Sequence, residues 1–185
     1  MTDYGSRDIP LSWDVFVTPG VPVVDNDLPP GEKQRLWPPL SSTLISGEGH
    51  AVLIDAFITV AQTRALVDWV VASRENLMTI YGTHGHGDHF FGATTVLERF
   101  PRARFVATPG VVKIMCQQAS PQWLAAFWNP RFPGQISDHL VIADELTRNL
   151  IDLEGHDLVV VPLGHTDTDN TTCLHVPSMS LGRRG

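Results

Sequence analysis

The chain has 185 residues, of which 43% are hydrophobic and 18% charged, a balance that predicts one globular domain over residues 1–185. The formal net charge of −7 argues against nucleic acid or an anionic membrane surface as a partner. Its 2 cysteines are too few for a disulfide framework, and no apolar run approaches the roughly 20 residues of a membrane span. Because MTDYGSRDIP has neither a basic start nor an apolar run, we expect no secretory signal and a cytoplasmic protein.

Apolar runs and proline-rich segments alternate over the first part of the chain. Residues 11–24 predict a strand broken by prolines and a glycine, and residues 25–39 predict a long loop that is a candidate for binding. Two short strands rich in valine, isoleucine and leucine follow, around a turn at residues 47–50. Residues 59–73 then show the apolar spacing of a helix and begin with threonine, a good capping residue.

The later elements are predicted as alternating strands and helices, with strands dominating towards the end. Residues 77–81 predict a short strand, and residues 89–100 a helix that ends at a proline. Another strand is expected at residues 103–109, and helical structure over residues 110–128 with an interruption at a proline. Further strands are predicted at residues 140–143, 158–162 and 172–176. This order indicates the α+β class.

The segment THGHGDH at residues 83–89 concentrates three histidines and an aspartate between a predicted strand and a predicted helix. Neutral imidazole and carboxylate are good ligands for zinc and other divalent metals. The two glycines give the backbone freedom to bring the first two histidines to one point, and they leave room beside a ligand. A polar loop with unrelated histidines is the alternative. The four matched positions, His84, His86, Asp88 and His89, favour a metal site.

Another histidine, His165, follows an apolar strand and a glycine in the segment GHTDTDN. A mononuclear catalytic zinc site has three protein ligands and one open water position, which His84, His86 and His165 could provide. Asp88 and His89 would then face a second metal, or Asp88 would orient the water. The alternative for His165 is a polar turn in which neighbouring threonine and aspartate side chains bond the backbone.

Together these segments resemble the metallo-β-lactamase superfamily, over most of the chain. THGHGDH matches its H-x-H-x-D-H signature, LIDAF resembles the segment that carries a structural aspartate, here Asp55, and GHTDTD resembles the later histidine motif. The resemblance implies a four-layer αββα sandwich with the metals at one edge, between two sheets. It also implies that a first metal is bound by His84, His86 and His165. A second metal would be bound by Asp88 and His89.

The sequence after His165 departs from the family pattern. The only acidic residues that follow are Asp167 and Asp169, in the same loop, so the family's bridging aspartate has no counterpart further along. No histidine follows His175, which lies too close behind His165 to match the family's last ligand. We therefore interpret the chain as a family member that lacks the C-terminal part of the fold. The sheet face left uncovered predicts self-association.

The expected function is that of a metal-dependent hydrolase acting on a small molecule with a lactam, lactone or thioester carbonyl. Zinc is the expected metal, as one or two ions, and the ligand types also permit iron or manganese. A metal-activated hydroxide would attack the carbonyl, and Asp88 would orient it or accept its proton. By resemblance His86 favours hydrolysis, because flavodiiron oxidoreductases of this fold have glutamate there. The alternative is an inactive, truncated family member with a partial metal site.

Aromatic side chains offer a wall for the substrate. Trp37 is the best candidate for an apolar mouth, because its predicted loop is long and polar. Ordinary packing is favoured for Trp123 and Trp128. Cys116 lies in a predicted helix and is expected to be buried there rather than catalytic.

Overall fold

The main sheet of the protein has six strands in the order β1-β4-β5-β6-β7-β8. The computed structural model describes residues 10–25, 27–28 and 30–179. Antiparallel pairing joins the first three strands, and parallel pairing the rest. The strands are β1 (Ser12–Thr18), β4 (Leu40–Ser46), β5 (His50–Ile54), β6 (Asn76–Tyr81), β7 (Arg104–Ala107) and β8 (Asp144–Glu145). Because β5, β6 and β7 are parallel, the loops that follow them meet at one edge of the sheet.

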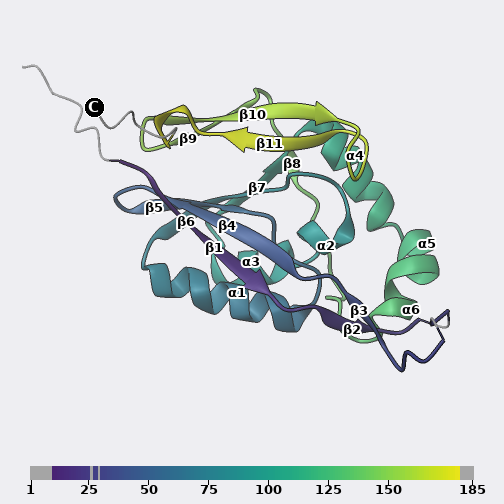
Figure 1. The fold of residues 1–185 in the computed structure, drawn as a ribbon. Helices are drawn as coiled ribbons and strands as arrows, with labels where there is room; N and C mark the ends of the chain where they lie inside the picture. Colours follow the sequence, from purple (N-terminus) through teal and green to yellow (C-terminus); the bar gives the residue numbers. More distant parts are fainter. Residues whose placement is uncertain (1–9, 26, 29, 180–185) are drawn as a thin grey trace, which may run out of the picture.

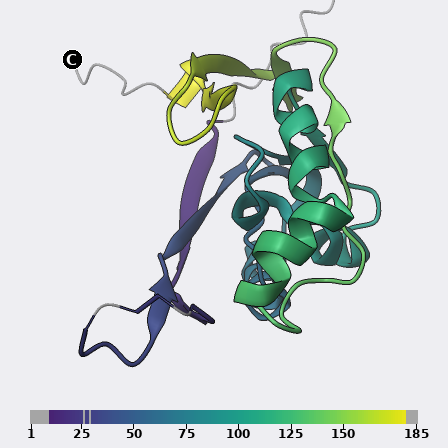
Figure 2. The ribbon, with the colours of Figure 1, turned by 90° about the vertical axis from the view of Figure 1, so that its right-hand side faces the viewer.

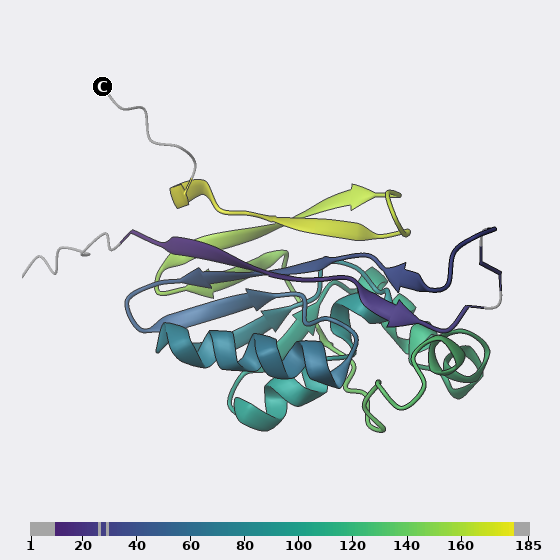
Figure 3. The same ribbon diagram turned by 60° about the horizontal axis from the view of Figure 1, so that its bottom comes forward.

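Helices cover one face of this sheet, as Figures 1 and 3 show. They are α1 (Val60–Ser73), α2 (Gly87–Phe90), α3 (Ala93–Arg99) and α4 (Pro109–Gln118), followed by α5 (Pro121–Trp123), a π-helical turn (Leu124–Trp128) and α6 (Asn129–Arg131). Thr59 caps α1: its hydroxyl accepts from the backbone N–H of Gln62, whose side chain accepts in return from the Thr59 N–H. Leu66 and Val70 of α1 are fully buried in the larger core between helices and sheet.

A second, three-stranded sheet packs on the other face, in the order β11-β10-β9 (Figure 3). Its strands are β9 (Leu150–Leu153), β10 (His156–Gly164) and β11 (Thr171–His175). A smaller core lies between the sheets and contains Val52, Tyr81, Leu158 and Val160. The described residues thus form the helix, sheet and sheet layers of the expected sandwich, and no second helix layer occurs among them. None of their helices is long and apolar enough to cross a membrane.

The proline-rich segment expected to be a loop contains part of a β-hairpin. β2 (Val21–Val23) pairs antiparallel with β3 (Arg35–Trp37), and Figure 2 shows this hairpin reaching out past the end of the main sheet. The backbone N–H of Val24 donates to the carbonyl oxygen of Arg131 in α6 (3.0 Å). The hairpin therefore contacts the helical layer at α6 and flanks the loops that follow β5 and β6.

Several predicted boundaries were wrong, for local reasons. The helix expected at 89–100 is divided into α2 and α3 at Gly92, whose backbone N–H donates to the carbonyl oxygen of Phe57 (3.0 Å) instead of continuing the helix. The strand expected at 140–143 is absent, because Val141 donates its N–H to the side chain of Thr94 instead of to a strand. The expected burial of Cys116 is also wrong, since it is exposed on α4.

Candidate metal centre

Four predicted ligands meet in the loop that follows β6 and in α2. The ring centroids of His84 and His89 are 3.9 Å apart, and those of His84 and His86 are 5.5 Å apart. His84 and Asp88 are buried, with 6% and 8% of their surface exposed. The structure therefore brings together His84, His86, Asp88 and His89 at one edge of the main sheet.

The glycines of the motif serve close packing. A Cβ atom on Gly85 would lie 2.5 Å from the Cβ of Ile114, and one on Gly87 would lie 2.5 Å from the ring of Phe91 and 2.8 Å from that of Trp128. Neither glycine has a positive φ angle. The need for glycine at these positions thus comes from the neighbouring helices and aromatic rings.

Asp55 orients two of the histidine rings, His89 directly and His84 through Thr83. It follows β5 with a φ of 62°, a left-handed conformation that aspartate tolerates better than most residues. Its carboxylate accepts from the backbone N–H of Thr83 (2.9 Å) and from the Thr83 hydroxyl (2.8 Å), and it lies 2.9 Å from Nδ1 of His89. The same hydroxyl lies 3.0 Å from Nδ1 of His84. Both rings are thus held through Nδ1, and Nε2 faces away from these contacts. On His89, that nitrogen would have to lose its proton before it could bind a metal.

Two buried polar atoms in the cluster have no hydrogen-bond partner among the residues that the structure describes. They are Nε2 of His84 and Oδ1 of Asp88. Buried polar atoms are nearly always hydrogen-bonded, and an orphan in a native protein calls for an explanation such as an ion. Neutral imidazole nitrogen and carboxylate oxygen are both donor types that suit a divalent metal. The residues present therefore fit a bound metal.

The protonation states follow from burial and from the pair formed by Asp55 and His89. Burial, then the charge of His89, lowers the pKa of His84, which favours the neutral imidazole that a metal needs. Burial opposes the charge of His89, but the Asp55 carboxylate outweighs it and raises the pKa of His89 to about 9. Burial likewise opposes ionisation of Asp55, and the charge and hydrogen bond of His89 still lower its pKa.

The second histidine motif contributes an aspartate rather than its histidine. Oδ2 of Asp167 lies 2.9 Å from Nδ1 of His86 and 3.6 Å from Nε2 of His84. The side chain of His165 is 77% exposed, and its Nδ1 lies 2.7 Å from Oδ1 of Asp169. Among the described residues, two groups of three side chains have ligand atoms that all lie within 4.8 Å of one another. The first group is Asp55, His84 and His89, and the second is His84, His86 and Asp167, so His84 belongs to both.

An aromatic cleft opens beside the cluster. It has a volume of about 690 Å³, and its polar lining consists of His86, Asp88 and Asp167 together with Arg35 and Gln118. Trp37 lines it, as its place in the proline-rich segment led us to expect. Trp123, for which packing was favoured, is 36% exposed and lines the cleft as well, whereas Trp128 is 2% exposed and combines both roles.

Trp37 makes a contact that the sequence did not suggest. Its indole Nε1–H donates to Oδ2 of Asp88 (3.0 Å), across 51 positions of the sequence. Thr83, which joins Asp55 to His84, was also missed as a functional residue. Its position directly before the H-x-H-x-D-H motif was the only signal in the sequence.

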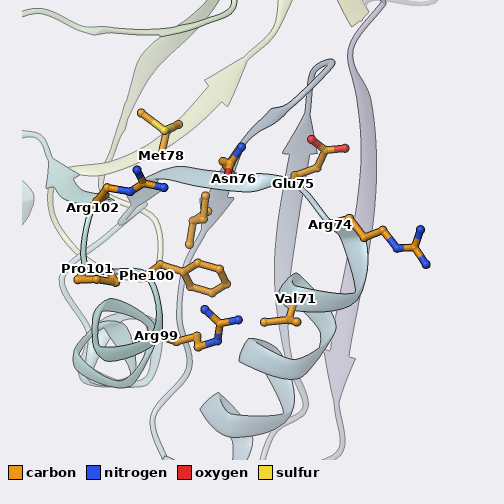
Figure 4. A pocket seen from close by; sticks show the side chains of 10 residues that line it. Val71, Arg74, Glu75, Asn76, Met78, Arg99, Phe100, Pro101 and Arg102 are labelled. Carbon is orange, nitrogen blue, oxygen red and sulfur yellow. The ribbon is translucent and has the colours of Figure 1, made fainter.

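A second cavity, of about 580 Å³, lies at the opposite end of β6 (Figure 4). The ends of α1 and α3 line it, and its lining contains Arg74, Arg99 and Arg102 but no histidine. Figure 4 shows Arg74 extending away from the other two arginines. This cavity is separate from the histidine cluster, so the cleft beside His86 and Asp88 is the candidate site.

Comparisons with known proteins agree with this architecture. Three solved structures are similar: a metallo-β-lactamase from Pontibacter korlensis (18% identity, TM-score 0.55), a β-lactamase domain protein from Burkholderia ambifaria (18%, 0.54) and the metallo-β-lactamase SMB-1 bound to 2-mercaptoethanesulfonate (17%, 0.54). The matches cover 75%, 75% and 72% of this chain, and 56%, 46% and 50% of those chains. The chain thus spans about half the length of these proteins.

At such identities the solved structures show the fold alone. A comparison with curated protein sequences gave no match. The profile of the Metallo-beta-lactamase superfamily, however, matches residues 36–181, which is most of the chain and includes both histidine motifs. The chain belongs to the metallo-β-lactamase superfamily.

Proposed function

We propose that the protein is a metal-dependent hydrolase whose metal, zinc in the first instance, is held by the cluster of His84, His86, Asp88 and His89. The observation that carries the proposal is the pair of buried atoms without partners, Nε2 of His84 and Oδ1 of Asp88. The contact of His84 with the Thr83 hydroxyl and that of His89 with Asp55 support it, because they orient the rings before any ligand arrives.

The chemistry divides between the metal and the side chains around it. A bound divalent metal lowers the pKa of a coordinated water and polarises the carbonyl under attack. Asp88 offers Oδ1 to the metal and so orients the attacking water beside it, while Oδ2 remains bound to Trp37. The aromatic walls of the cleft exclude bulk water and hold the apolar part of the substrate.

The substrate proposed is a small molecule with a lactam, lactone or thioester carbonyl. The cleft supports an apolar body next to that carbonyl, because its lining contains three tryptophans and a phenylalanine as well as leucine and proline side chains. One protein of similar fold is described as bound to 2-mercaptoethanesulfonate. A thiol is a soft ligand for zinc, so the same compound is a suitable inhibitor to test here.

The test is hydrolysis of a panel of lactams, lactones and thioesters by the zinc-loaded chain. We expect turnover of at least one class, inhibition by 2-mercaptoethanesulfonate, and loss of about 10²-fold or more in His84→Ala. His139→Ala is a matched control, because His139 lies outside the cluster and forms its hydrogen bonds to Thr94 and Ser137 through its backbone. Equal rates in His84→Ala and the control would contradict the proposal.

A second candidate is an inactive family member that keeps a partial metal site. The observation that favours it is the exposed position of His165, which leaves the cluster one histidine short of the set implied by the family. In this case the chain would bind metal and lose it in His84→Ala, but it would hydrolyse none of the substrates in the panel.

A further inference from the structure

We infer that Trp37 is a positioning residue for Asp88: its indole N–H holds one carboxylate oxygen so that the other is presented to the metal. This rests on the proposed function. The hydrogen bond from Nε1 of Trp37 to Oδ2 of Asp88 measures 3.0 Å, and Oδ1 of the same carboxylate is buried without a partner. One oxygen is therefore fixed and the other is left available.

The indole is the donor on which this orientation depends. Among the residues that the structure describes, no other group donates a hydrogen bond to the Asp88 side chain. Nε2 of His89 lies 4.0 Å from Oδ2, too far for a hydrogen bond. A neutral indole N–H also differs from an arginine or lysine, because it orients a carboxylate without neutralising the charge that attracts a metal.

The Trp37 ring is itself held in place. It packs edge to face against Trp128 and Phe132, with ring centroids 5.6 and 5.4 Å away. Its backbone is paired with Val21 in the hairpin, and a Cβ atom on Gly20 would lie 2.6 Å from the Trp37 carbonyl oxygen. Because the ring cannot turn without disturbing these contacts, the indole N–H points at Asp88 before a metal binds.

The same ring lines the substrate cleft. One face of the hairpin therefore serves the substrate, while the N–H of the same side chain serves the carboxylate beside the metal. This placement makes the proline-rich segment part of the metal centre.

The experiment compares two Trp→Phe variants of the whole chain. Trp37→Phe keeps an aromatic ring and removes the N–H that bonds Asp88. Trp128→Phe removes a buried indole bond of the same kind, from Nε1 to Oε1 of Gln118 (2.8 Å), in the same aromatic group. Zinc affinity is measured by competition with a chromophoric chelator, and thermal unfolding of the metal-free proteins reports the structural damage.

We expect Trp37→Phe to weaken zinc binding by about 10-fold to 100-fold, the range typical of groups that orient a metal ligand. Trp128→Phe should bind zinc at least about tenfold more tightly than Trp37→Phe. Both variants should lose thermal stability. Equal zinc affinities in the two variants would overturn the inference and leave Trp37 a packing residue.

A second measurement needs no metal. In the metal-free protein, the indole proton resonance of Trp37 should move upfield in Asp88→Ala, because its acceptor is lost, while that of Trp128 stays in place. An unmoved Trp37 resonance would overturn the inference. If the wild-type chain takes up no zinc and the resonance still moves, the proposed function fails while the contact between Trp37 and Asp88 stands.

Discussion

Individual residues of the cluster are fixed by neighbours that are distant in the sequence. Asp55 reaches His89, and Trp37 reaches Asp88, through single hydrogen-bonded contacts of 2.9 and 3.0 Å. The site therefore depends on the backbone path of the loop that carries the histidines, and Gly85 is one closely packed point of that path.

Gly85→Ala should destabilise the protein and weaken metal binding. The added Cβ would lie 2.5 Å from the Ile114 side chain and 3.0 Å from the backbone nitrogen of Met115, so α4 or the loop must shift. Overpacking of this kind costs about 1–3 kcal/mol. Urea unfolding measures the loss. Gly49→Ala is the control, because the nearest atom to its Cβ is a flexible glutamate oxygen at 3.9 Å; equal losses in the two variants would refute the packing argument.

The variants Asp167→Asn and His165→Ala test which residue of the GHTDTDN segment binds the metal. Asp167 contacts His86 and His84, whereas His165 points to Asp169, so Asp167→Asn should lose more metal affinity, by roughly 10-fold or more. Chelator competition on both variants gives the order. The reverse order would show that the loop rearranges and brings His165 to the metal, as the family resemblance implies.

At the scale of elements, the second sheet is joined to the loop after β6 by a chain of hydroxyl groups. The Tyr81 hydroxyl lies 2.6 Å from that of Thr172, which donates to the carbonyl oxygen of Thr83 (2.7 Å). Tyr81 is fully buried between the sheets. β11 is thus tied to the residue that orients His84.

Tyr81→Phe should lower the free energy of unfolding by about 1 kcal/mol at neutral pH, because one buried hydrogen bond is lost. The same substitution should also change how the free energy of unfolding depends on pH in alkaline solution. Burial raises the pKa of Tyr81 to about 12, above the roughly 10 of an unfolded tyrosine. Tyr81 in the folded protein therefore keeps its proton up to a higher pH than in the unfolded chain. Its contribution to the free energy of unfolding is full below about pH 10 and is lost as the pH rises through 12. Urea titrations at several pH values should show a smaller alkaline loss in Tyr81→Phe; identical slopes would contradict this.

The sequence predicted the elements better than their contacts. Strand 77–81, helix 59–73 and the cluster of His84, His86, Asp88 and His89 could be read from local patterns, because hydrophobic period and motif spacing are local properties. Strand β9 was missed, since LIDL has four residues and becomes a strand only by pairing with β10. The contact of Trp37 with Asp88 depends on tertiary packing, and no spacing in the sequence encodes it.

At the scale of the whole molecule, three layers share two cores, and we predict that residues 1–185 behave as one domain. One side of the main sheet remains partly uncovered. β1 is its edge strand, and Trp13 and Val17 on it are 64% and 61% exposed. Exposed apolar side chains on an edge strand favour pairing with another copy.

We expect the chain to self-associate through this edge, and the double variant Trp13→Lys/Val17→Lys to reduce association, because charge on an edge strand opposes pairing. Sedimentation velocity over a range of concentrations measures it. A wild-type chain that stays monomeric at its highest soluble concentration would contradict the expectation.

The most direct test of the account is the metal content of the purified chain after dialysis, determined by elemental analysis for zinc, iron and manganese. We predict one or two tightly held ions, zinc in the first instance, which are lost in His84→Ala and retained in His139→Ala. A wild-type chain that retains no metal would contradict it, and would mean that the orphaned atoms of His84 and Asp88 do not form a metal site.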